Sequence, residues 1–213
     1  RKERRMKTKF STKKLVTIAV LTALTTVATF AIKIPTVATE GYVNVGDTVV
    51  MFAAIALGPI AGFIAGGLGS CLADLISGYP HWILPTFIIK GIEGLIVGLL
   101  FRLFKKTKLN EYVSAGICAV IGAILMIAGY FVASTIMKGS AAVALTGVPG
   151  NCLQGLFSVI LSEVLLVAAK KTKITDKLEF DFCGKSQKDL KEEENEAKVE
   201  EKSSDNDADN KEE

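Results

Sequence analysis

Long apolar segments follow one another through most of this 213-residue chain. The four longest cover residues 15–32, 83–101, 113–137 and 148–169. Each approaches or exceeds the ~18 apolar residues that indicate a membrane-spanning helix. Residues 48–77 are apolar too, but Gly58 and Pro59 interrupt them, which predicts a short helix over 48–57, a turn and a longer helix. We therefore expect an all-α, polytopic membrane protein, a compact bundle of six transmembrane helices with a short second helix.

Charged residues are concentrated at the two ends. Residues 1–14 hold eight basic residues and one acidic residue, and residues 170–213 hold ten Lys and fifteen Asp or Glu. This distribution predicts a basic N-terminus over 1–14, a membrane domain over 15–172 and an acidic tail over 173–213. Because the tail is low in apolar residues, we expect it to be disordered.

The basic residues also predict the orientation in the membrane. With six spans, the N-terminus, residues 102–108 and residues 170–173 fall on one side, and all three are rich in Lys or Arg. Cytoplasmic loops carry such an excess, so we expect both termini in the cytoplasm. Lys33 and Lys138 are the basic loop residues expected on the outer side.

Small residues recur at helical spacing. Gly58, Gly62 and Gly66 repeat every four residues, and Gly94 and Gly98 do the same in the next apolar segment. This pattern favours close packing of helices. Ala19 and Ala23 give the first helix a small, smooth face for a helix of the same chain or of a partner.

Polar side chains of the apolar segments converge on the outer end. The first helix runs outward, so residues 35–47 form an outer loop, and the connection 78–82 lies on the same side. The following helix runs inward and places its polar pair roughly 10–16 Å below its start. The predicted site residues are Asn44, Asp47, Tyr79, His81, Trp82, Lys90, Glu93, Tyr130, Asn151 and Gln154. A polar cup open to one side predicts a pocket for a small polar molecule captured from outside.

Each of these residues also has a purely structural interpretation. Lys90 and Glu93 stand three residues apart and either pair with each other or hold a ligand. Asp47 is a candidate N-cap of the second helix. His81 beside Trp82 is a candidate interfacial anchor.

Four further polar residues have structural interpretations of the same kind. Asn151 and Gln154 suit interhelical hydrogen bonds. Asp74 suits a cap or a bond within the bundle. Glu163 is expected at the cytoplasmic boundary or against a partner, outside the pocket.

Two stretches resemble a known family. Residues 40–94, with the blocks "GYVNVGD", "DLISGYPHW" and "IIKGIEG", together with "VPGNCLQG" at 148–155, resemble the substrate-binding S components of energy-coupling factor (ECF) transporters. The resemblance is greatest to the group associated with hydroxymethylpyrimidine, pyridoxine-type compounds or riboflavin. It implies six helices, an outer pocket and a first loop that acts as a lid.

The resemblance also implies partners: a transmembrane coupling subunit, docked against Ala19 and Ala23, and two ATPase subunits. The S component itself binds no ATP, and this chain has no GxxxxGK[ST] loop. Its four cysteines form no CxxC or Cys/His cluster, so neither a zinc site nor a disulfide framework is indicated. We therefore expect a vitamin-binding importer subunit without a cofactor or metal, and no catalysis.

Two alternative functions compete with this interpretation. A stand-alone secondary transporter or facilitator usually shows internal repeats and a midplane site, and neither is evident. An intramembrane enzyme would use Asp74, His81 or Glu93 as acid or base, but a single His and no metal-binding spacing offer few combinations.

Overall fold

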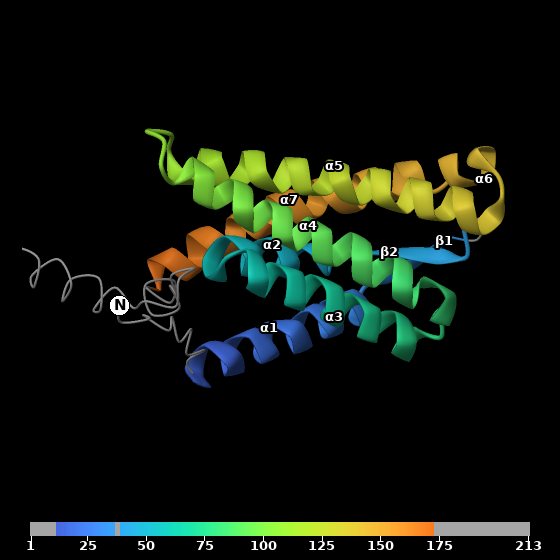
Figure 1. Cartoon of the computed structure of the whole chain (residues 1–213), viewed down its shortest axis with the longest axis horizontal. Helices are drawn as coiled ribbons and strands as arrows, with labels where there is room; N and C mark the ends of the chain where they lie inside the picture. The colour runs from blue at the N-terminus through green and yellow to red at the C-terminus, as the bar shows by residue number, and fades with distance from the viewer. Residues whose placement is uncertain (1–11, 37–38, 173–213) are drawn as a thin grey trace, which may run out of the picture. The chain divides into compact units, whose positions relative to one another are not determined.

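The computed structural model describes residues 12–36 and 39–172. The predicted tail and most of the predicted basic N-terminus lie outside these residues. Figure 1 shows the element order along the chain. The elements are α1 (Thr12–Ala31), β1 (Lys33–Thr36), β2 (Gly41–Asn44), α2 (Asp47–Leu57), α3 (Pro59–Ser77), η1 (Pro80–Trp82), α4 (Ile83–Phe104), α5 (Glu111–Lys138), α6 (Ala141–Leu145) and α7 (Val148–Lys171).

Five stretches of the described chain are helical, long and apolar enough to cross a membrane. They correspond to α1, α3, α4 with η1, α5, and α6 with α7. The remaining helix, α2, has 11 residues and is therefore about 16 Å long, half of the ~30 Å hydrocarbon core. The predicted membrane fold with a short second helix is confirmed, and α6 is an addition that the sequence analysis did not foresee.

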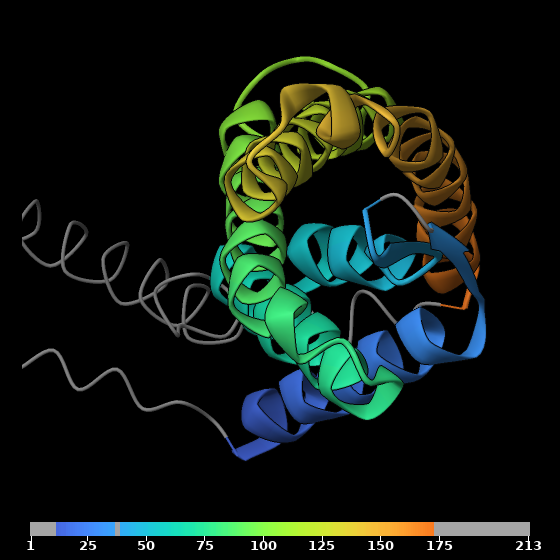
Figure 2. The same ribbon diagram turned by 90° about the vertical axis from the view of Figure 1, so that its right-hand side faces the viewer.

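The short helix α2 forms the centre of the bundle. Figure 2 shows it surrounded by the longer helices, and nine of its residues are buried. The surrounding helices turn large apolar side chains outward: Leu15 is 60% exposed and Ile136 is 76% exposed. Many large apolar residues lie on the outside of the bundle, as expected for a helical bundle in lipid, because lipid covers the outer apolar surface.

Helices α3 and α4 pack backbone against backbone. A Cβ atom added to Gly94 would collide with the carbonyl group of Gly62, and one added to Gly66 would collide with the carbonyl group of Lys90. The predicted spacing of small residues therefore serves packing within the chain. It also fixes the backbone of α4 at Lys90 against α3.

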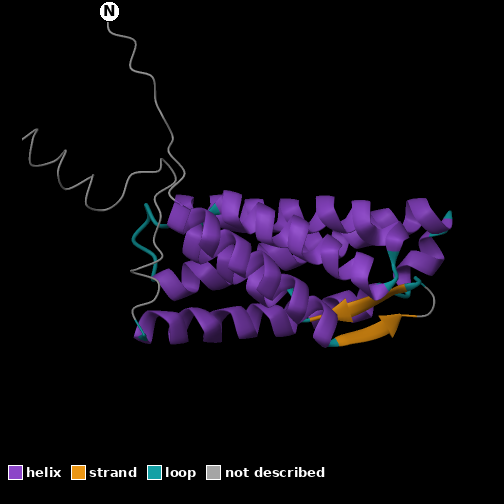
Figure 3. Ribbon diagram, turned by 90° about the horizontal axis from the view of Figure 1, so that it is seen from below, coloured by secondary structure: helices purple, strands orange, loops and turns teal. Residues whose placement is uncertain are grey.

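The predicted outer loop contains a β-hairpin, which the sequence analysis missed. Strands β1 and β2 are antiparallel, with Lys33 opposite Asn44 and Thr36 opposite Gly41. Figure 3 shows the hairpin at one end of the helices. In Figure 1 the same end carries α6 and the α3–α4 connection, whereas the α4–α5 connection and the end of α7 lie at the opposite end.

Candidate functional site

A cavity lies beneath the hairpin, with an empty volume of about 590 Å³ counted to its mouth. Its wall combines the hairpin with α1, α3, α4, α5, α7 and the short elements η1 and α6. Six of the ten predicted site residues line it: Asn44, Trp82, Lys90, Tyr130, Asn151 and Gln154.

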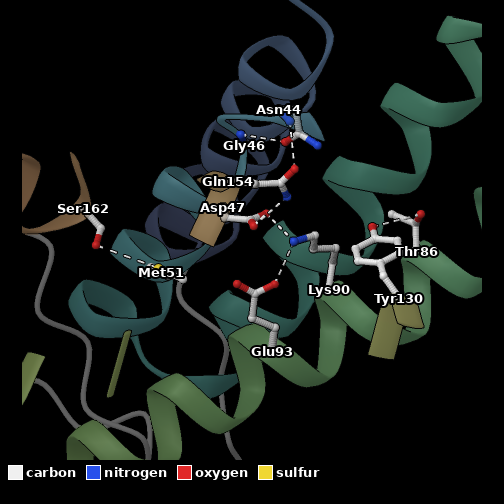
Figure 4. A network of polar contacts seen from close by, with 10 residues as sticks. All are labelled: Asn44, Gly46, Asp47, Met51, Thr86, Lys90, Glu93, Tyr130, Gln154 and Ser162. Carbon is white, nitrogen blue, oxygen red and sulfur yellow. Dashed lines mark hydrogen bonds and ion pairs between the residues drawn. The ribbon is translucent and has the colours of Figure 1, made fainter. Parts of the chain in front are cut away.

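An ion-pair cluster forms the inner side of this cavity. The Lys90 ammonium pairs with Asp47 and also donates to Glu93 Oε2 at 3.0 Å. Figure 4 shows Lys90 between the two carboxylates. All three side chains are at most 1% exposed. The sequence left open whether Lys90 and Glu93 pair with each other or hold a ligand. In this structure they pair, and Asp47 is the second partner of Lys90.

Asp47 does not act as an N-cap. It is the first residue of α2, the capping position is Gly46, and none of the described side chains makes a capping hydrogen bond to the helix. Its second oxygen instead accepts a hydrogen bond from Gln154 Nε2 at 2.8 Å. The interpretation as a cap was wrong because the ion pair within the bundle uses the carboxylate.

Gln154 connects the ion-pair cluster to the hairpin. Its Oε1 accepts a bond from the backbone N–H of Asn44 at 2.8 Å, and the Asn44 side chain accepts from the N–H of Gly46 at 2.8 Å. These bonds, visible in Figure 4, join β2, the start of α2 and α7. Gln154 therefore links the hairpin directly to the carboxylate of Asp47.

Aromatic residues form the outer side of the cavity. The Tyr42 hydroxyl donates to Asp74 Oδ1 at 2.6 Å, and the Tyr130 hydroxyl donates to Thr86 at 3.2 Å. The rings of Trp82 and Tyr130 meet edge to face at 5.6 Å. Burial, followed by the charge of Asp74, raises the pKa of Tyr42 well above its usual range, so this hydroxyl keeps its proton and remains a donor.

The hairpin is fastened over the site at Glu40. Its carbonyl oxygen accepts a bond from Trp82 Nε1 at 2.9 Å and lies 3.1 Å from His81 Nε2. Its carboxylate pairs with Lys138 at 2.5 Å, and this hydrogen-bonded ammonium lowers the pKa of Glu40. Glu40 has a φ of 50°, rare for a residue with a side chain. Such a conformation persists where several contacts fix it.

Four predicted site residues do not line the cavity. Asp47 is bound to the wall residues Lys90 and Gln154, and Glu93 is bound to Lys90. Tyr79 is half-buried and its ring lies 5.1 Å from the ring of Tyr42 at a tilt of 52°, while His81 is exposed and contacts the hairpin. His81 and Tyr79 thus support the cover of the cavity from outside.

The remaining predicted positions lie elsewhere. Glu163 is half-buried on α7 and does not line this cavity. Ala19 and Ala23 are both exposed on α1.

The set of ten predicted site residues leaves out several polar residues of the wall. Asp74 and Tyr42 line the cavity, as do six hydroxyl-bearing residues: Thr29, Thr36, Thr39, Ser70, Thr86 and Ser134. Ser and Thr are common in membrane helices as packing residues, so their presence alone gave no signal. Of these six residues, only Thr86 lies one helical turn from Lys90 on the same helix, so helical spacing from Lys90 would have identified only Thr86.

Several of these wall residues carry polar atoms that are buried and have no hydrogen-bond partner in the described part of the chain. They are Thr29 Oγ1, Ser70 Oγ, Asp74 Oδ2 and Ser134 Oγ. Buried polar atoms in native proteins are nearly always paired. Four such atoms around one cavity indicate a site shaped for a polar ligand.

The sequence matches the model of the family "ECF-type riboflavin transporter, S component" over residues 9–171. The chain belongs to this family of transporter subunits. Its relatives include an uncharacterized protein of Pyrococcus woesei, 39% identical over 65% of this chain and 84% of that protein. The thiamine precursor transporter HmpT of Lactococcus lactis is 28% identical over 76% of this chain and 90% of its own length.

The fold agrees with this membership. A solved S component of a bacterial ECF transporter matches with a TM-score of 0.57, over 75% of this chain and 96% of that one, at 20% identity. The predicted family is thereby confirmed. The protein is a membrane-embedded, substrate-binding transporter subunit, which is not an enzyme class.

Proposed function

We propose that this subunit captures a small vitamin or vitamin precursor from outside the cell and delivers it for ATP-driven import. The observation that supports this proposal is the cavity beneath the hairpin, whose wall holds four buried polar atoms that have no hydrogen-bond partner in the described part of the chain. The ligand would supply those partners. The aromatic rings of Trp82 and Tyr130 offer a flat ligand a surface to stack on.

Equilibrium binding to the purified chain in detergent tests this proposal. The panel is hydroxymethylpyrimidine, pyridoxine, thiamine, riboflavin and pantothenate, with native mass spectrometry of any co-purified molecule as a second readout. We expect one compound to bind in a one-to-one complex. Absence of any bound small molecule in both measurements would contradict the proposal.

We further propose that the chain works with a transmembrane coupling subunit and two ATPase subunits, with both termini in the cytoplasm. Ala19 and Ala23 support the docking part, because they are exposed one turn apart on α1 between Leu15 and Leu24, which are exposed too. Small residues let a partner helix approach closely. The basic residues at the α4–α5 connection and at the end of α7 support the orientation.

Co-purification with the coupling subunit tests the docking surface. Ala19→Leu with Ala23→Leu adds bulk to the small face and is expected to reduce recovery of the complex, whereas ligand binding stays unchanged. Val20→Leu is the matched control, since Val20 is already large and 59% exposed on the same helix. Equal recovery of both variants would contradict the surface. Uptake by the chain alone in liposomes would contradict the dependence on ATPases.

A further inference from the structure

One carboxyl group of the cavity wall has no ion-pair partner among the residues that the structure describes. Asp74 lies in the last turn of α3 and is 4% exposed. Its Oδ1 accepts the Tyr42 hydroxyl at 2.6 Å, and the Thr86 hydroxyl is the other polar neighbour of the carboxyl group. Its Oδ2 is buried and has no hydrogen-bond partner among the described residues, and Asp74 is part of the cavity wall. A carboxylate at membrane depth is costly unless it is paired.

The nearby cation is already bound elsewhere. Lys90 is the cationic residue among the described residues that line the cavity, and its ammonium pairs with Asp47 and Glu93. Three carboxyl groups therefore share one ammonium group in this region. The surplus of carboxyl groups over ammonium groups disfavours an anionic ligand, such as one carrying a carboxylate or a phosphate, and favours a ligand that brings positive charge or N–H donors.

The surroundings of Asp74 suit a nitrogen base on an aromatic ring. Tyr42 donates to the carboxyl group, Thr86 neighbours it, and the rings of Trp82 and Tyr130 belong to the same wall. Aromatic faces attract cations. The unpartnered hydroxyls of Ser70 and Ser134 in the same wall offer hydrogen bonds to ring nitrogens or hydroxyl groups of the ligand.

We propose that Asp74 is the specificity-determining residue of this site and binds a protonated or N–H-bearing nitrogen of the ligand. The ligand class is an aromatic heterocycle with an amino group on or beside the ring. A carboxylate receives two N–H bonds from an amidine-like edge, or a charged bond from a primary ammonium. This inference rests on the proposed function, since it names the chemistry of the molecule that the same cavity takes.

Two matched pairs of probes test the inference on the unmodified full-length chain. The first pair is 4-amino-5-hydroxymethyl-2-methylpyrimidine and its 4-oxo counterpart, and the second is pyridoxamine and pyridoxine. Each pair differs chiefly by the amino group. We expect the aminated member of at least one pair to bind more tightly by about tenfold or more, because its replacement leaves the buried carboxylate unpaired.

The variant Asp74→Asn sharpens the test. It keeps the size of the side chain and the acceptor for Tyr42, but it loses the charge, so the preference for the aminated member should fall to about one- to threefold. Glu163→Gln is the matched control, because it removes a carboxylate from α7 outside the cavity. It should keep the preference of the unmodified chain.

The outcomes separate this inference from the proposed function. Tighter binding of the neutral members, or an unchanged preference in Asp74→Asn, would overturn the role of Asp74 while small-molecule binding persists. Binding of riboflavin or pantothenate with neither pair bound would have the same meaning. If Asp74→Asn does not fold, the ratio measured on the unmodified chain still decides.

Discussion

Replacing Lys90 by Met is the sharpest test of the ion-pair cluster. Met is unbranched and apolar, so it fills much of the space of the lysine side chain without its charge. The substitution leaves Asp47 and Glu93 side by side, both fully buried, with Gln154 as the remaining donor to Asp47. Two uncompensated carboxylates then share one region of low dielectric constant.

The expected loss of stability follows from the geometry. At 3.0 Å between Lys90 Nζ and Glu93 Oε2, the attraction is about 5 kcal/mol at an effective dielectric constant of ~20. Removing one partner of a buried pair typically costs about 3–5 kcal/mol, because the other charge stays buried. We expect Lys90→Met to lower the free energy of unfolding by an amount in that range.

A double-mutant cycle measures this coupling. Unfolding in mixed micelles with increasing SDS gives the free energy for the unmodified chain, Lys90→Met, Glu93→Gln and the double variant. The double variant should recover about half of the loss or more, since Asp47 keeps its bond to Gln154 and the second charge is gone. Lys138→Met is the control, because the same substitution at the pair with the exposed Glu40 should cost far less.

Two results would refute this reasoning. One is a free energy of unfolding for Lys90→Met within about 0.5 kcal/mol of the unmodified chain, the size of an ordinary surface substitution. The other is a double variant no more stable than Lys90→Met. Either would mean that the two carboxylates do not depend on the ammonium for their burial.

Three further predictions concern packing, ligand contact and the hairpin. Gly66→Ala should destabilise the chain by about 1–3 kcal/mol and weaken ligand binding, because the added Cβ would displace the α4 backbone at Lys90. Gly116→Ala is the control: its Cβ has room, so the same unfolding and binding assays should show no change. Asn151→Ala should weaken binding by about tenfold, roughly 1.4 kcal/mol, with unchanged affinity removing it from the site. Lys138→Met should speed ligand dissociation at pH 7. The pKa of Glu40 is lowered from 4.5, so the unmodified chain should keep its ligand dissociation rate down to pH 4.5 and release the ligand faster as the pH falls through the lowered pKa. A dissociation rate that changes neither in Lys138→Met nor at low pH would contradict the role of the Glu40–Lys138 pair in holding the hairpin over the site.

The helices of this chain were predictable because each apolar segment carries its own signal. Lipid requires a long apolar run for every span, and Gly58-Pro59 marks the end of α2 as a local break. The hairpin gave no comparable signal. Its strands have four residues each, Pro35 lies within β1, and its contacts to Trp82 and Lys138 come from distant parts of the sequence.

The depth of the site residues along the helices was predictable from the sequence, but the residues that they bind were not. Helix rise placed Lys90 and Glu93 near the end that carries the hairpin, and Asn151 and Gln154 at the same end. The pairing of Lys90 with Asp47 was not visible, because it depends on how two helices face each other. The interpretation of Asp47 as an N-cap agreed with the local sequence, but in the folded chain the carboxylate binds Lys90 and Gln154 instead.

The length of α2 explains why a carboxylate is tolerated so deep in the bundle. At its far end, a Cβ added to Gly58 would lie 2.6 Å from the Arg102 guanidinium, so α2 and α4 meet there. Asp47 lies 11 residues before Gly58 and Lys90 lies 12 residues before Arg102, which are rises of about 16 and 18 Å. The two helices therefore bring Asp47 and Lys90 to the same depth. A second helix of full spanning length would carry its first residue to the surface, whereas the short α2 holds Asp47 where Lys90 and Gln154 can bind it.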